Sequence, residues 1–165
     1  VRPLIGCQLD LCYLDPEPGR PPYRPAPVVL LCQSEAGWAN LMKLSSCAYL
    51  GQADGSVQVS LAELEKHAGG LICLTGGPDG PLGRLLQGGQ QARAEALLRR
   101  LAAAFPARLY VELQRHPVDG GLPEAERLTE GPSIDLAYGL DLPLVATNDV
   151  HFPKEDLFEA HDALM

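Results

Sequence analysis

Short apolar runs recur along this chain, and segments of helical character separate them. Each run is short enough to be a buried β-strand, about 4–8 residues in most cases. Strands are predicted over residues 2–14, 28–32, 71–75, 108–116 and 142–147. Helices are predicted after Ser34, over residues 61–67, 81–87, 89–104 and 122–139, and from about Lys154. Because strands alternate with helices, the sequence predicts an α/β fold with a mostly parallel sheet.

Capping and helix-breaking residues set several boundaries. Ser34 and Ser60 each precede a helical pattern and can cap it. Residues 15–27 hold six prolines and are predicted to form a loop, because proline fixes φ and lacks an N–H. Gly131-Pro132 is expected to break the helix that contains it. The helix after Ser34 is expected to bury one face, made of Trp38, Leu41, Met42, Leu44 and Leu50.

Composition restricts the class of protein. The 165 residues suit one domain, and the net charge of −8 offers no basic face for a nucleic-acid backbone. No apolar run approaches the ~20 residues of a membrane-spanning helix. The five cysteines are odd in number and lack metal-finger spacing, so buried free thiols in a cytoplasmic protein are expected. The start at Val1, without an initiator Met, indicates a piece of a longer protein.

Two predicted strands end in a carboxylate and a histidine. Glu112 and His116 close one strand, and Asp149 and His151 follow another. In parallel α/β folds, ligands gather at the carboxyl ends of strands. Imidazole and carboxylate together suit Zn, Mn or Fe, which can activate water for phosphate-ester hydrolysis. The spacings place each pair on one face of its strand. The alternative is that these groups only hydrogen-bond one another and cap helices.

A glycine-rich segment follows the strand at residues 71–75. Gly76-Gly77-Pro78-Asp79-Gly80 lies between a strand and a helix, as a phosphate-binding loop would. It lacks the Gly-Lys-Ser/Thr ending of a P-loop and the glycine spacing of a dinucleotide site. A turn is the predicted structure.

A series of motifs in fixed order covers nearly the whole chain. They are residues 3–7, 28–32, 37–44, 70–77, 110–116, 146–151 and 159–162. The series resembles the polymerase and histidinol phosphatase (PHP) domain at the N-terminus of the bacterial DNA polymerase III alpha subunit. The resemblance implies a partial, distorted (β/α) barrel. Residues 1–165 would be a PHP fragment without its N-terminal strands, and the palm and fingers of the polymerase would lie outside it.

The resemblance also implies a site and its departures. Active PHP domains bind a cluster of about three metal ions, an arrangement suited to phosphate-ester hydrolysis. His116, Asp149 and His151 match metal-binding positions, and Glu112 lies beside them. Three other ligand positions are replaced: Gln8 stands where relatives have Glu, Pro27 where they have His, and Gly77 where they have Cys.

The function implied is therefore that of a catalytically degenerate scaffold. The longer protein would be a DNA-directed DNA polymerase that uses Mg in its palm and reaches DNA through other domains. This segment would contain no catalytic residue of polymerisation and would dock other holoenzyme subunits, especially the proofreading exonuclease. The alternative is a metal-dependent 3′–5′ exonuclease or phosphoesterase that holds Zn or Mn with Glu112, His116, Asp149 and His151. A stand-alone phosphatase of the wider family is a third possibility.

Overall fold

The structure is a computed structural model that describes residues 3–14, 23–50, 56–117, 121–148, 150 and 154–164. The strands described are β1 Gly6–Cys12, β2 Ala26–Cys32, β3 Val59–Ser60, β4 Leu71–Leu74, β5 Leu109–Gln114 and β6 Leu144–Thr147. The α-helices are α1 Glu35–Leu50, α2 Leu61–Lys66, α3 Pro81–Gln87, α4 Gln91–Ala104, α5 Glu124–Gly139 and α6 Phe158–Asp162. Two 3₁₀ turns are η1 Gly77–Asp79 and η2 Glu155–Leu157.

The strands of the described ranges form one sheet in the order β3-β1-β2-β4-β5-β6. β1 and β3 are parallel, as are β4, β5 and β6, whereas β2 is antiparallel to both of its neighbours. The predicted α/β class and mostly parallel sheet are confirmed. The reversal at β2 follows from the proline-rich connection before it, because a parallel crossover normally needs a helix.

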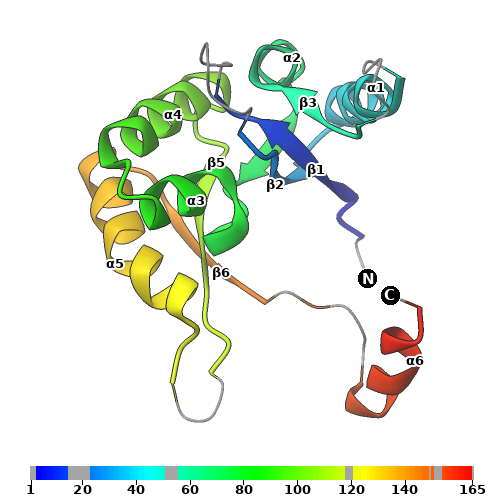
Figure 1. Ribbon diagram of the computed structural model, residues 1–165. Coiled ribbons are helices and arrows are strands. Elements are labelled where there is room, and N and C mark those ends of the chain that lie inside the picture. Colours follow the sequence, from blue (N-terminus) through cyan, green and yellow to red (C-terminus); the bar gives the residue numbers. More distant parts are fainter. Residues whose placement is uncertain are drawn as a thin grey trace.

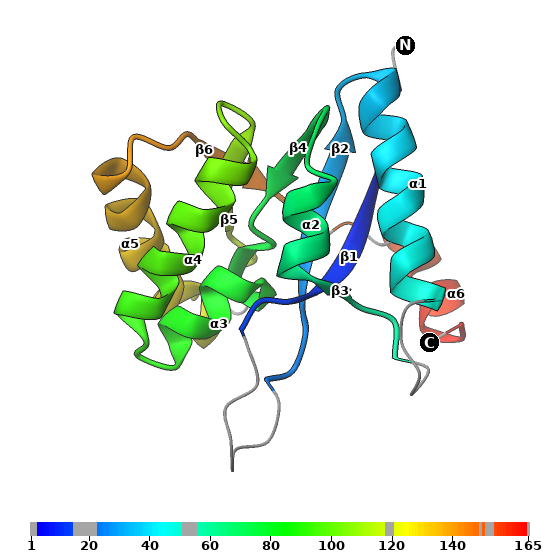
Figure 2. The same cartoon turned by 90° about the horizontal axis from the view of Figure 1, so that it is seen from above.

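The two faces of the sheet differ in what covers them. Figure 1 shows α1, α2, α4 and α5 in an arc along one side of the strands, and Figure 2 shows α1 and α5 at the two ends of this row. Leu9, Val28 and Val111 are buried on the helix-covered face, while Gln8 and Val29 alternate with them on the other. One covered face and one open face match the expected partial barrel, in which helices lie outside the strands.

Helix α1 buries a different stripe from the one predicted. Ser34 does cap it, since its hydroxyl accepts a hydrogen bond from the Gly37 N–H at 3.2 Å. Its buried residues are Gly37, Leu41, Leu44 and Ala48. Trp38, Met42 and Leu50 are exposed, so their placement on the buried face was wrong. Trp38 and Met42 instead border, with Ile5, a groove of about 530 Å³ beside β1.

Proline acts differently from expectation in two elements. β2 begins at Ala26 and so includes Pro27, which the sequence had assigned to the loop of residues 15–27. Pro27 pairs only with β1 in the ladder, and proline is tolerated at the start of a strand. Helix α5 runs through Pro132 without the predicted break. The preceding Gly131 has no Cβ to collide with the proline ring.

The remaining elements lie close to their predicted ranges, except the two-residue strand β3, which was not predicted. Ser60 caps α2 by accepting a hydrogen bond from the Glu63 N–H. The five cysteines are free thiols, but only Cys73 is fully buried, and the other four are half-buried. Within the described ranges, no helix has the length and apolar character needed to cross a membrane.

Candidate functional site at the carboxyl ends of the strands

A polar pocket of about 270 Å³ lies where β4, β5 and β6 end. It is lined by Gln8, Pro27, Val29, Gly76, Asp79, Glu112, Gln114, Asn148 and Val150. The pocket is on the open face of the sheet, because Gln8 pairs with Val29 and both alternate with core residues. Residues distant in sequence therefore meet at the position where α/β folds commonly bind ligands.

The resemblance predicted three positions at which a metal ligand has been replaced, and two of them line this pocket. Gln8 on β1 and Pro27 on β2 line it together with Glu112. The third, Gly77, lies beside it and faces Gln114: a Cβ built on Gly77 would lie 2.8 Å from Cδ of that glutamine. The structure thus gathers the predicted positions around Glu112. Whether they once held metal remains a prediction.

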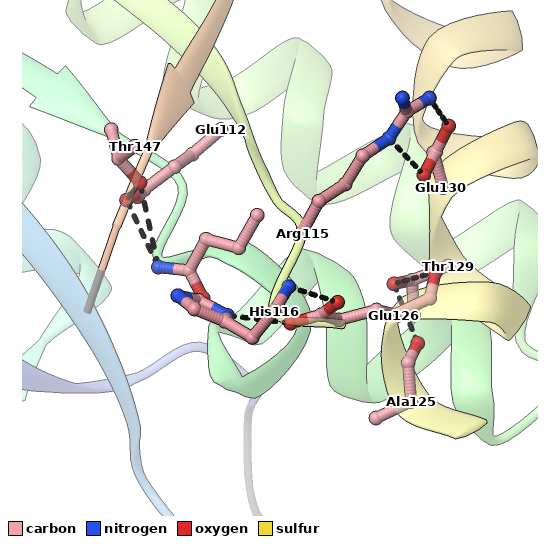
Figure 3. Close-up of polar contacts among 9 residues, drawn as sticks. Glu112, Arg115, His116, Ala125, Glu126, Thr129, Glu130 and Thr147 are labelled. Carbon is pink, nitrogen blue, oxygen red and sulfur yellow. Dashed lines mark hydrogen bonds and ion pairs between the residues drawn. The ribbon is translucent and has the colours of Figure 1, made fainter. Parts of the chain in front are cut away.

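Glu112 is a buried carboxylate that accepts hydrogen bonds from three segments. Its Oε2 accepts the Gly76 N–H at 2.9 Å, and its Oε1 accepts the Thr147 hydroxyl. Gln114 Nε2 also donates to Oε1, at 3.4 Å. Figure 3 shows Glu112 and Thr147 turned towards each other. Burial of a charge is costly unless hydrogen bonds replace its hydration, and these donors supply them.

His116 contacts a different carboxylate, Glu126. β5 ends at Gln114, so His116 lies beyond the strand, and its side chain turns towards α5 (Figure 3). Its Nδ1 lies 2.7 Å from Glu126 Oε1, and its backbone N–H donates to Glu126 Oε2 at 2.9 Å. Glu126 is buried in the first turn of α5, where the helix dipole favours a carboxylate. Glu112 and His116, which were predicted to share a face, therefore have different partners in these hydrogen bonds.

The other predicted metal ligands, Asp149 and His151, fall outside the described residues. Among the residues that are described, no group of three or more His, Cys, Asp or Glu side chains is arranged to hold a metal ion. The described lining residues with possible ligand atoms in their side chains are three carboxamides and two carboxylates: Gln8, Gln114, Asn148, Asp79 and Glu112. Amide oxygen suits hard cations such as Mg and Ca better than it suits Zn.

The glycine-rich loop forms the predicted turn. Gly76 and Gly77 have φ of 80° and 58°, in the left-handed region that glycine adopts at little cost. A side chain on Gly76 would also meet the backbone, because its Cβ would lie 2.0 Å from the Pro27 carbonyl oxygen. The turn brings the Gly76 N–H to Glu112, so this segment contributes a backbone hydrogen bond to the site.

Burial and the charge of Glu112 both raise the pKa of the neighbouring Cys73 thiol. Burial, with a smaller contribution from the Glu112 charge, raises the pKa of Cys73 to about 12. This cysteine lies on β4, on the helix-covered side of the sheet. Its thiol therefore stays protonated and behaves as part of the core.

Sequence reasoning did not assign roles to Gln114, Thr147 or Glu126. One signal was available for Gln114, because it lies two residues after Glu112 and so projects from the same strand face. Thr147 could be paired with Gln114 only once the β5–β6 register was known. Glu126 approaches His116 through the packing of α5 on β5, which periodicity does not reveal.

The chain is similar to a known domain family and to several polymerase subunits. The PHP domain family matches residues 1–116. DNA polymerase III subunit alpha of Caulobacter vibrioides is 42% identical over 166 residues, covering 100% of this chain and 14% of the relative. The same subunit of Pseudomonas fluorescens is 37% identical over 163 residues, 98% of this chain and 13% of the relative. In Treponema pallidum the identity is 35% over 175 residues, with shares of 100% and 14%.

The chain thus spans about a seventh of the length of these relatives. The family match covers β1 to β5 and the Glu112 network on β4 and β5, and the polymerase relatives extend the similarity through β6. The expected resemblance is confirmed by both comparisons. With its mostly parallel sheet, outer helices and strand-end pocket, the chain belongs to the PHP domain family.

Proposed function

We propose that this chain is a fragment of the PHP domain of a replicative DNA polymerase alpha subunit and serves there as a scaffold and docking segment. The relatives that cover the whole chain are DNA polymerase III alpha subunits, which supports the first part. Because the chain corresponds to 13–14% of their length, template-directed synthesis and its Mg ions would reside in the rest of that protein.

The proposed scaffold role rests on the internal hydrogen bonds that Glu112 accepts. Each of its oxygens already accepts at least one internal hydrogen bond. Across the pocket, Gln8 offers a neutral amide and Pro27 offers no side-chain ligand atom, so Asp79 is the one further carboxylate among the described lining residues. A hydrolytic metal cluster needs several carboxylates and imidazoles that converge on its ions. This pocket is better suited to holding strand ends together than to activating water.

One observation favours the enzymatic alternative, a metal-dependent 3′–5′ exonuclease or phosphoesterase. Histidines that bind metal commonly pair one ring nitrogen with a carboxylate, and the His116–Glu126 pair has this form. Asp149 and His151 would then complete a Zn or Mn site with His116 and Glu112. The Zn and Mn content of the full-length protein separates these two hypotheses. A stand-alone phosphatase is distinguished by a reading frame that ends soon after Met165.

The docking role predicts contact with the proofreading exonuclease subunit. The chain offers three lysines as reporters: Lys43 on α1, Lys66 on α2 and Lys154 before η2, all exposed. Amine-reactive cross-linking of the full-length alpha subunit with the exonuclease subunit, followed by mass spectrometry, is expected to join at least one of them to the partner.

The matched control replaces each of these lysines with arginine, which keeps the charge and removes the reactive amine. The corresponding cross-links should then disappear while the complex still forms. Cross-links that reach only other domains of the alpha subunit, with all three lysines modified but unlinked, would contradict docking on this domain.

A further inference from the structure

We propose that Gln114 acts as a built-in neutral substitute for a cation at Glu112 and so joins the carboxyl ends of β4, β5 and β6 without metal. The inference rests on the scaffold function proposed above and assigns the residue that makes it structurally possible. The position of the Gln114 carboxamide, between Glu112 and Thr147, carries the argument.

The amide nitrogen of Gln114 reaches two oxygens at once. Nε2 lies 3.4 Å from Glu112 Oε1 and 3.4 Å from Thr147 Oγ1. The Thr147 hydroxyl in turn donates to Glu112 Oε1, so the three side chains form a closed ring of hydrogen bonds. Two of them come from β5 and one from β6, which makes the ring a cross-link between neighbouring strands.

Hydrogen-bond chemistry fixes which end of the carboxamide faces the ring. An ionised carboxylate only accepts, and the Thr147 hydroxyl hydrogen is already directed at Glu112. Both neighbours therefore require a donor, and the NH₂ group of Gln114 supplies two hydrogens. The reversed amide would place its oxygen against two acceptors.

The loop after β4 is shaped around this side chain. An ideal Cβ on Gly77 would lie 2.8 Å from Gln114 Cδ, 2.9 Å from Oε1 and 3.2 Å from Nε2. Gln114 thus occupies the space that a side chain at position 77 would need. The adjacent Gly76 N–H completes the network on the other oxygen of Glu112 and brings in the end of β4.

The network would keep three parallel strand ends at fixed separation around a buried charge. Each donor in it is neutral, so the cross-link does not depend on a dissociable ion. Hydrogen bonds to a charged group are stronger than those between neutral groups. Loss of the Gln114 donor would leave the buried carboxylate of Glu112 with fewer hydrogen bonds, so the strand ends around it, including the turn at Gly76, should open more often.

The test is residue-resolved hydrogen–deuterium exchange of the full-length protein with Gln114→Met, which keeps the side chain's length and removes its donor. Exchange of the Gly76 N–H is expected to speed up roughly tenfold. The Leu71 N–H, which bonds Ala68 at the other end of β4, is the internal reference and should stay unchanged. Gln8→Met is the control, because Gln8 lines the same pocket on an exposed part of β1.

Unchanged exchange at Gly76 in Gln114→Met would overturn the inference. If exchange instead rises equally at Leu71, the variant has unfolded, and Thr147→Val decides: selective opening at Gly76 supports the network, and no change refutes it. Addition of EDTA to the unmodified protein should leave Gly76 protected. Stoichiometric Zn or Mn, lost together with nuclease activity in His151→Ala, would overturn the scaffold function, whereas an inert Gln114 variant in a protein without Zn and Mn would overturn only this inference.

Discussion

At the scale of single residues, the buried charge of Glu112 controls its surroundings. Three neutral donors satisfy it, and its field adds to burial in raising the pKa of the Cys73 thiol. The sequence predicted Glu112 near the end of a strand, and Glu112 does lie close to the end of β5. It could not predict that His116 turns to Glu126, because that contact depends on how α5 packs against β5.

The raised pKa of Cys73 predicts a protected thiol. Treatment of the folded protein with iodoacetamide at about pH 8 should modify the half-buried Cys47 well before Cys73, because thiolate is the reactive form. Peptide mass spectrometry measures both sites. Since the folded pKa lies above the unfolded one, this thiol should also disfavour the folded state progressively as pH rises from 9.0 to about 12. Modification of the two cysteines at equal rates in the folded protein would contradict the burial of Cys73.

At the scale of elements, the close approach of the α1 backbone to Gly70 decides which face of α1 is buried. An ideal Cβ on Gly37 would lie 1.9 Å from the Gly70 carbonyl oxygen, so the helix packs through its glycine. Trp38 is consequently left 45% exposed, although its size favoured burial. Caps and helix lengths were predictable because they depend on local residues. The buried stripe was not, since it depends on a contact between residues distant in sequence.

Gly37→Ala tests this close approach. Alanine normally stabilises a helix by about 1 kcal/mol relative to glycine. At this position we expect destabilisation by about 1–3 kcal/mol, because the methyl group must push α1 away from the Gly70 backbone. Gly139→Ala is the matched control, since nothing lies within 4 Å of its Cβ position in α5. Urea unfolding followed by circular dichroism measures both, and equal stabilisation by the two variants would refute the packing.

At the scale of the whole molecule, the sheet has a helix-covered face and an open face, and the strand-end pocket lies on the open one. Alternation of strands and helices was enough to predict the α/β class and the mostly parallel sheet. The antiparallel direction of β2 was not predicted, because the alternation of elements does not show which strands pair or in which direction. That Gln8 and Pro27 share a pocket with Glu112 likewise required the strand order.

The central claim is that this pocket is held by internal hydrogen bonds and not by metal. The most direct measurement is elemental analysis of Zn and Mn in the full-length protein after dialysis without chelator. We expect both metals well below one ion per chain. Stoichiometric Zn or Mn, lost together with 3′–5′ nuclease activity in His151→Ala, would contradict the claim and establish the enzymatic alternative.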